Sequence, residues 1–511
     1  MSLAGFAAAG AASEVPPPLW SAVEIPSGQI DRAVSAIDGL ARELMQRTGV
    51  PGMAVAVVHD DRVVYARGFG VRKIGHPEPV DADTVFQLAS VSKSVGATVV
   101  AAAVGRGWTG WNRPVVDMLP WFRLADPYVT RNVTVGDLYS HRSGLPDHAG
   151  DSLEDLGYSR AEVLRRLRYL PLSPFRVTHI YTNFGLTAAA EAVAAARGTP
   201  WSRLSQELVY GPLGMASTSS EFSAYVAQPN RAFGHVREGG AWFARHVRQP
   251  DAQSPEGGVS SSVKDMAQWM RMVLALGTLD GKEVIGREPL AEALSPHIRS
   301  SAAAQPAYRG SFYGYGVGVG NDGTGRVRLA HSGGFLLGAG TAFALLPSEN
   351  LGIITLTNGS PIGVPEALNA GFLDLVETGR VQRDWLTAVT PLFAPMYANP
   401  SVLAGHPVPP HPEPARALRD YVGTYANAYY GEARVSKDGN ELVLALGPEP
   451  KRFRLSHWSG DQFAYEPVGE NAVGIAAVWF RRNSAGQVQA LEVENFEEGV
   501  RVLPKLREAR P

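Results

Sequence analysis

Apolar residues recur at regular intervals along the chain, and the interval changes from one segment to the next. A first helix, ending near residue 47, is predicted by apolar residues three or four apart: Ile30, Val34, Ile37, Ala41 and Leu44. Two strands are predicted next, at residues 53–58 and 63–65, with a turn at Asp60-Asp61 between them. A spacing of four then predicts a helix that begins at Ser90 and contains Val91, Val95, Val99 and Ala103.

The middle of the chain, from about residue 106 to 300, is predicted to be mostly helices and loops, with clearer helices at 161–170 and 265–276. Strands return at 326–330, 340–346 and 352–357, and a further helix is predicted near 365–377. This order favours an α+β fold, in which both ends of the segment build one antiparallel sheet. Helices would flank that sheet, and the long insertion would form a helical subdomain.

A proline-rich segment separates this part of the chain from a different C-terminal pattern. Six prolines between Pro400 and Pro414 exclude a helix or an inner strand and predict a stiff linker. Short β-like runs separated by glycine turns follow and predict a small all-β barrel or sandwich. We therefore divide the chain into a flexible tail (1–27), a catalytic domain (28–390), a linker (391–414) and a small β domain (415–508).

The composition excludes several function classes. The chain has 511 residues, is 45% hydrophobic and 19% charged, and carries a formal net charge of −2, which gives no electrostatic footprint for nucleic acid. It has no cysteine, which excludes disulfides and thiolate catalysis. No apolar run is long enough to span a bilayer as an integral segment. Residues 3–13 are small and apolar, as in the remnant of an export signal, although a cloning remnant or a floppy tail fits equally.

Ser90 and Lys93 form the first candidate catalytic pair. Three residues apart on one helix, their side chains share a face and can meet. A serine hydroxyl becomes a good nucleophile only when a neighbour takes its proton, and lysine can do so only when it is neutral. The start of a helix also leaves free backbone N–H groups, one of which can face an oxyanion. A Ser-x-x-Lys tetrapeptide is nevertheless common by chance.

Tyr181 and Asn183 are the second candidate pair. A tyrosine near Lys93 could relay a proton to or from a leaving group, and its pKa, about 10 when unperturbed, would fall beside a cationic lysine. Asn183 can both donate and accept, so it could hold the lysine and a substrate amide. The alternative is an ordinary loop in which Asn183 caps the next helix.

The third candidate segment is His331-Ser332-Gly333-Gly334, which follows a predicted strand. Glycines allow a substrate backbone to approach closely, and the N–H of Gly334 could be a second oxyanion donor. His331 is expected to titrate near neutrality and to assist proton transfer or bind a carboxylate. The alternative is a strand end followed by a glycine turn.

The order and wide spacing of these three motifs carry more weight than any one of them. The chain resembles the serine β-lactamase and penicillin-binding-protein superfamily, in its class C-like branch. The resemblance covers about residues 30–380 and extends to further recurrent segments: residues 86–93, 133–138, 140–146, 212–215, 257–262 and 315–318. The C-terminal part, through residues 421–425, 430–431, 455–458 and 461–463, resembles the lipocalin-like barrel appended to some peptidases of this superfamily.

The resemblance implies roles for individual residues. Ser90 would be the acylated nucleophile, and Lys93 and Tyr181 would share the acid and base work, with Asn183 orienting them. The backbone N–H groups of Ser90 and Gly334 would form the oxyanion hole, with Ser332 and Gly333 contacting substrate. No cofactor or metal is expected, and the partner would be a small molecule or short peptide. A homo-oligomer stays open, and a periplasmic or secreted location is favoured over a cytoplasmic one.

One departure from the family pattern bears on the substrate. Class C β-lactamases usually carry lysine, a fixed cation, where this chain has His331. Histidine there resembles D-aminopeptidases, DD-carboxypeptidases and esterases of the same fold. We therefore expect a serine hydrolase acting on amide or peptide bonds, with D-residues as one substrate class. The alternatives are an esterase or weak β-lactamase, and a non-catalytic penicillin-binding sensor.

Overall fold

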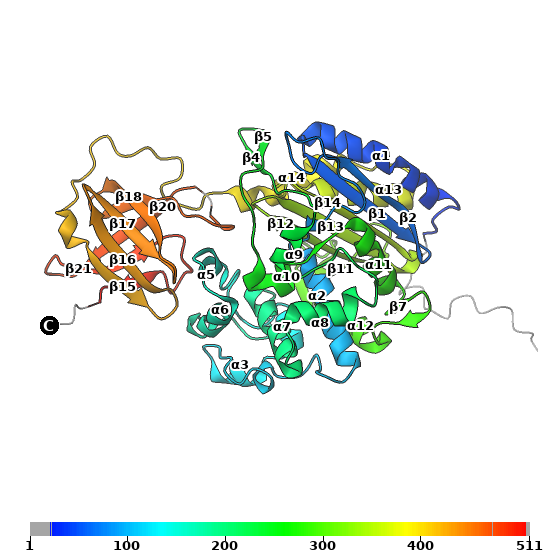
Figure 1. Ribbon diagram of the computed structural model, residues 1–511, viewed down its shortest axis with the longest axis horizontal. Helices are drawn as coiled ribbons and strands as arrows, with labels where there is room; N and C mark the ends of the chain where they lie inside the picture. The colour runs from blue at the N-terminus through cyan, green and yellow to red at the C-terminus, as the bar shows by residue number, and fades with distance from the viewer. Residues whose placement is uncertain (1–20, 22, 473, 507–511) are drawn as a thin grey trace, which may run out of the picture.

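The computed structural model describes residues 21, 23–472 and 474–506 (Figure 1). Most of the predicted tail, residues 1–27, therefore lies outside the described residues. Over the described ranges, none of the helices combines the length and the apolar character needed to cross a bilayer.

A central antiparallel sheet of eight strands organises the N-terminal part of the chain. Strands from both ends of this part meet in the middle, because Met53–His59 pairs with Leu351–Thr357. In spatial order the strands are β2 (Arg62–Gly70), β1 (Gly52–His59), β14 (Leu351–Thr357), β13 (Ala339–Leu346), β12 (Val327–Phe335), β11 (Gly318–Asn321), β10 (Ser311–Tyr313) and β9 (Ile298–Ser301). The predicted α+β fold is confirmed.

Helices cover both faces of this sheet. On one face, α1 (Gln29–Thr48) and α13 (Val364–Thr378) pack on Met53, Val55 and Val57 of β1. On the other face lie α2 (Val91–Gly105) and α11 (Val263–Leu274), in the apolar cluster that contains the alternate residues of β1. Successive strand side chains point to opposite faces, so a strand buried on both sides is apolar throughout.

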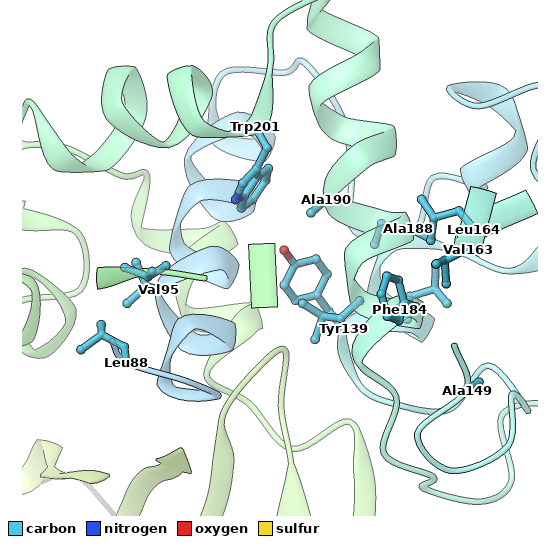
Figure 2. Close-up of a cluster of buried hydrophobic side chains, with 14 of the residues drawn as sticks. Leu88, Val95, Tyr139, Ala149, Val163, Leu164, Phe184, Ala188, Ala190 and Trp201 are labelled. Atoms are coloured by element: carbon cyan, nitrogen blue, oxygen red, sulfur yellow. The ribbon is translucent and has the colours of Figure 1, made fainter. Parts of the chain in front are cut away.

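The insertion between β2 and β9 is mainly helical, as predicted. Its other helices are α3 (Pro127–Asn132), α4 (Val135–Tyr139), α5 (Asp151–Asp155), α6 (Arg160–Arg166), α7 (Asn183–Arg197), α8 (Trp201–Ser205), α9 (Phe222–Ala227), α10 (Ser254–Gly257) and α12 (Arg287–Ala293). Short strand pairs interrupt them: β3 (Phe86–Gln87) with β6 (Ser260–Ser261), β4 (Val236–Glu238) with β5 (Ala241–Phe243), and β7 (Thr278–Leu279) with β8 (Lys282–Glu283). Figure 2 shows Val95 of α2, Tyr139 of α4 and Phe184 of α7 in one buried cluster, which fixes α2 against α7.

Two elements differ from the expectation. Strand β12 continues to Phe335, so His331 to Gly334 lie within the strand instead of in a turn after it. Pairing with β13 along its length explains this, since it overrides the weak strand preference of glycine. An unpredicted helix, α14 (Trp385–Tyr397), also occupies the first residues of the predicted linker, despite Pro391 and Pro395 inside it.

The C-terminal part is a nearly closed barrel of eight antiparallel strands. They are β15 (Gly423–Asn427), β16 (Gly431–Asp438), β17 (Glu441–Leu446), β18 (Lys451–Ser459), β19 (Gln462–Tyr465), β20 (Ala476–Arg482), β21 (Val488–Val493) and β22 (Val502–Pro504). A bridge between Tyr425 of β15 and Lys505, the residue after β22, joins the two ends of the sheet. In Figure 1 the barrel lies beside the end of the helical insertion that carries α5 and α6.

Candidate functional site

Ser90 lies at a sharp turn between the short strand β3 and helix α2. The preceding residue, Ala89, has a φ of 47°, in the left-handed region that a side chain with a Cβ rarely adopts. Such a conformation costs on the order of 1–3 kcal/mol and persists only where the surrounding structure enforces it. Ser90 itself is the N-cap residue of α2, although its hydroxyl makes no capping bond. The hydroxyl is therefore left for other partners.

Those partners are two of the residues selected from the sequence. Lys93 Nζ donates to Ser90 Oγ at 3.0 Å, and the hydroxyl of Tyr181 donates to the same oxygen at 2.8 Å. Lys93 Nζ also lies 4.5 Å from the centre of the Tyr181 ring. Lys93, from the same helix face, and Tyr181, from a distant segment, thus meet at the hydroxyl oxygen of Ser90.

Lys93 has two further partners, Asn183 and Glu256, and Glu256 was not among the residues selected from the sequence. Its Nζ donates to Asn183 Oδ1 at 2.8 Å and forms a short ion pair with Glu256, and both charged side chains are buried. Gly96 makes this approach feasible, because a Cβ there would lie 2.7 Å from the carbonyl oxygen of Pro255. Glu256 precedes the Gly257-Gly258 segment, but no periodic pattern marks a carboxylate there as a partner of Lys93.

Burial dominates the electrostatics of this group. It lowers the pKa of Lys93, against the opposing effect of Glu256, and it raises the pKa of Glu256. The expectation that the pKa of Tyr181 falls beside a cation is wrong. Burial, aided by the Glu256 carboxylate, raises the pKa of Tyr181 well above its usual value. Tyr181 therefore stays protonated at neutral pH, whereas Lys93 is shifted toward its neutral form.

Asn183 connects the lysine to a second carboxylate. Its Nδ2 donates to Asp151 Oδ2 at 2.7 Å, and His148 Nδ1 lies 2.8 Å from the same oxygen. The capping alternative for Asn183 does not hold, because Thr182 occupies the N-cap of α7 and Asn183 is the first helical residue. Its side chain instead fixes Lys93 relative to Asp151. Asp151 is a second residue of the site that was not selected from the sequence.

Strand β12 brings Gly333 directly against the start of α2. A Cβ on Gly333 would lie 2.5 Å from the carbonyl oxygen of Leu88 and 2.9 Å from the backbone nitrogen of Ser90. β11 pairs with β12 only as far as Ala330. Within the described part of the chain, the segment from His331 to Phe335 therefore has a strand partner, β13, on one side alone. This open edge beside Ser90 suits an extended substrate.

His331 does not behave as the titratable group that was expected. Its Nε2 lies 2.7 Å from the hydroxyl of Tyr313, and its Nδ1 lies 2.6 Å from the carbonyl oxygen of Ser332. Burial, with the nearby charge of Lys93, lowers its pKa to about 3. His331 is therefore neutral at physiological pH and cannot act as a fixed cation for a substrate carboxylate.

Ser90 lies at the wall of a cavity of about 920 Å³ that both parts of the chain line. From the N-terminal part, its walls include Ser90, Tyr181, Asn183, Glu256 and the segment Ser332–Leu336. From α14, the linker and the barrel they include Met396, residues 399–402, Glu470, Asn471, residues 494–497 and Arg501. The volume lies in the range of pockets for small molecules and short peptides.

Comparison with known proteins agrees with this architecture. The sequence signature of the family described as Beta-lactamase matches residues 37–377, and a domain of unknown function, DUF3471, matches residues 408–504. The chain is 25% identical over 498 residues to the unguisins hydrolase ungD of Aspergillus violaceofuscus, which covers 88% of this chain and 86% of that protein. It is 23% identical over 360 residues to the D-alanyl-D-alanine-carboxypeptidase/endopeptidase AmpH of Escherichia coli, which covers 67% of this chain and 89% of AmpH.

The fold is also shared with a solved structure. The octameric penicillin-binding protein homologue from Pyrococcus abyssi superposes with a TM-score of 0.60 at 20% identity, covering 92% of this chain and all of that one. The match extends across both parts of the chain.

Proposed function

The chain belongs to the β-lactamase family, and we propose that it is a serine hydrolase that forms an acyl-enzyme on Ser90 and cleaves amide or peptide bonds. One observation carries the proposal: Ser90 Oγ lies within 3.0 Å of Lys93 Nζ and 2.8 Å of the Tyr181 hydroxyl, at the wall of a cavity. A serine with two proton-transferring neighbours is the arrangement that nucleophilic catalysis needs.

The directions of the pKa shifts separate the two neighbours. In the structure Lys93 donates to three acceptors, on Ser90, Asn183 and Glu256, as an ammonium does. Loss of one proton from Lys93 to solvent would leave a neutral amine beside Ser90 Oγ. The lowered pKa of Lys93 favours that loss. Lys93 is thus the base, and the protonated Tyr181 is the acid for the leaving group.

The reaction would proceed in two stages. Ser90 Oγ bonds to the carbonyl carbon while its proton passes to Lys93, and the N–H groups of Ser90 and Gly334 bind the oxyanion. The bond to the leaving group then breaks, and the amine departs with a proton from Tyr181. Water attacks the resulting ester and gives one proton to the deprotonated Tyr181, and Ser90 Oγ leaves with the proton held by Lys93. A carboxylic acid is released, and all three side chains regain their starting protonation states.

The charges around the cavity narrow the substrate class. His331 is neutral, so the position offers no fixed cation for a substrate carboxylate. Both arginines of the cavity wall are already paired, Arg248 with Glu154 and Arg501 with Glu492. Several carboxyl groups line the same wall: Asp147, Asp151, Glu256, Glu470, Glu494 and Glu497. We expect neutral or amine-bearing substrates to be preferred over β-lactams and other anionic substrates.

The neutral His331 also favours a second candidate function, that of a carboxylesterase. An ester without a free carboxylate suits the neutral His331, and an alcohol leaves without needing the proton that an amine needs. A panel of a short-chain nitrophenyl ester, D- and L-alanine anilides, a D-Ala-D-Ala peptide and a chromogenic cephalosporin separates these activities. We expect turnover of the anilides and the ester to exceed that of the two carboxylate-bearing substrates.

The nucleophile is tested directly with an active-site fluorophosphonate followed by mass spectrometry. We expect one adduct, on the peptide that contains Ser90, and none in Ser90→Ala. The matched control is Ser35→Ala, which removes an exposed hydroxyl of α1 and should label like wild type. Wild-type protein that carries no adduct would contradict the proposal. An adduct without turnover of any substrate would indicate a penicillin-binding sensor instead.

A further inference from the structure

The barrel contributes an acidic side chain to the region next to β12, the strand that carries the proposed oxyanion donor Gly334. Glu470 lies in residues 466–472, the described start of the loop between β19 and β20, and is 9% exposed. Its carboxyl group accepts a short hydrogen bond from the backbone N–H of Leu336 and another, at 3.3 Å, from that of Leu337. These residues directly follow Phe335, the last residue of β12, which also carries Gly334.

The helical insertion also holds this barrel segment. Asp155, at the end of α5, accepts from the backbone N–H groups of Glu470 and Asn471, each at 2.9 Å, and from Asn471 Nδ2 at 3.0 Å. Gly469 allows this contact, because its φ is +132° and a Cβ there would lie 2.2 Å from Asp155 Cγ. These contacts anchor the barrel segment to the N-terminal part of the chain, in addition to its contact with the residues after β12.

Arg248 completes the connection. Its guanidinium pairs with Glu154 at 2.6 Å, lies 3.9 Å from Glu470, and covers the Phe335 ring at 5.1 Å from the ring centre. The cation thus faces acidic side chains of both parts of the chain while it packs on the last residue of β12. A continuous set of contacts runs from α5 through the barrel loop to the strand that carries Gly334.

We infer that Glu470 is a positioning residue for the hydrolysis at Ser90, and that the docked barrel holds the end of β12 in the geometry its oxyanion donor requires. The inference rests on the proposed function of Ser90. The N–H of Gly334 is effective only if it lies where the oxyanion forms, and small displacements of such donors lower the rate strongly. The barrel is accordingly a part of the working enzyme and not a remote appendage.

The test exploits the acceptor oxygen of Glu470. Glu470→Leu introduces an apolar side chain of similar size that cannot accept a hydrogen bond from Leu336. Glu470→Gln retains one acceptor oxygen. We expect Glu470→Leu to lower kcat by about tenfold or more, since an oxyanion donor is worth about 10²–10³ in kcat and is here displaced, not removed. The KM should change by less than about threefold, because the donor acts mainly in the transition state.

Rescue and control variants separate positioning from packing. Glu470→Gln should recover most of the kcat that Glu470→Leu loses, a difference that loss of volume alone would not produce. Glu466→Gln changes an exposed carboxylate of the same loop and should behave like wild type. Each variant is measured in the full chain, with circular dichroism to confirm folding and with the rate of Ser90 labelling by the fluorophosphonate.

The outcomes are distinguishable. Slow labelling and low kcat in Glu470→Leu, restored in Glu470→Gln, would support the inference. A folded Glu470→Leu variant with wild-type kcat, or a Glu470→Gln variant as slow as Glu470→Leu, would overturn the inference and leave the proposed function intact. A wild-type chain that is not labelled at Ser90 would overturn both.

Discussion

Replacing Glu256 with glutamine tests the assignment of Lys93 as the base. The amide oxygen of glutamine can still accept from Lys93 Nζ, so the change removes a charge while the hydrogen-bonded geometry is retained. In the native chain Glu256 raises the pKa of Lys93, by its charge and by its hydrogen bond, against the larger opposing effect of burial. Without that charge burial remains, so the pKa of Lys93 must fall further.

The size of the effect follows from the contact. An opposite charge in direct contact shifts a pKa by about 1–3 units, and one unit corresponds to about 1.4 kcal/mol. Because the base must be neutral, the rate rises as the pH passes through the pKa of Lys93. The acidic limb of the kcat/KM profile should therefore move to lower pH by at least about one unit in Glu256→Gln. The plateau should fall, because a less basic amine is a weaker proton acceptor.

The assay is the pH dependence of kcat/KM with a neutral nitrophenyl ester, supported by the pH dependence of Ser90 labelling. Asp151→Asn provides a graded comparison, since Asp151 also raises the pKa of Lys93 but without touching it. We expect the acidic limb to lie at the highest pH in wild type, lower in Asp151→Asn and lowest in Glu256→Gln. An unchanged limb, or a shift to higher pH, in a folded Glu256→Gln variant would refute Lys93 as the base.

Three further predictions concern other groups of the cavity. Tyr181→Phe should slow anilide hydrolysis at least about tenfold more than ester hydrolysis, since general acid catalysis contributes about 10²–10⁴ and an amine needs the proton more than an alcohol does; equal losses on both substrates would contradict the role of Tyr181 as the acid. His331→Lys should raise kcat/KM for the cephalosporin relative to the ester by roughly tenfold, because it adds a cation worth about 1–2 kcal/mol to a carboxylate; an unchanged ratio would place that carboxylate elsewhere. The pKa of Glu470 is about 8 in the folded chain against an ordinary 4.5, so the folded state holds the extra proton and stability should fall as the pH rises from about 5 to 8. The slope can reach about 1.4 kcal/mol per pH unit, and Glu470→Gln should flatten it in urea unfolding; an equal slope in the variant would exclude Glu470 as its source.

The sequence predicted the parts of the fold that depend on local patterns. Helix α1, helix α13 and strands β1, β13 and β14 lie within a few residues of their predicted ranges, because their apolar periodicity is strong. The strand predicted at the position of β12 ends too early, at residue 330. Histidine, serine and glycine have weak strand preference, and their pairing with β13 is a long-range effect. Helix α14 was missed because its two prolines argue against a helix.

The residues of the candidate site divide in the same way, into those that local spacing predicts and those that depend on long-range packing. The spacing of Ser90 and Lys93 places both on one helix face, so their contact could be predicted from the sequence alone. Glu256 and Glu470 could not be found in this way. Each is a single carboxylate in a distant segment, and only the packing of α10 on α2 or of the barrel loop on β12 reveals its partner.

The two electrostatic expectations that failed have one physical cause. The sequence suggested that the pKa of Tyr181 would fall beside a cation and that His331 would titrate near neutrality. In the structure, burial is the largest influence on both groups, and it also dominates Lys93 and Glu256. Burial depends on what encloses the site, and here the enclosing wall includes the barrel. The C-terminal barrel therefore lines the cavity beside Ser90, and through Glu470 it contacts the backbone that follows β12.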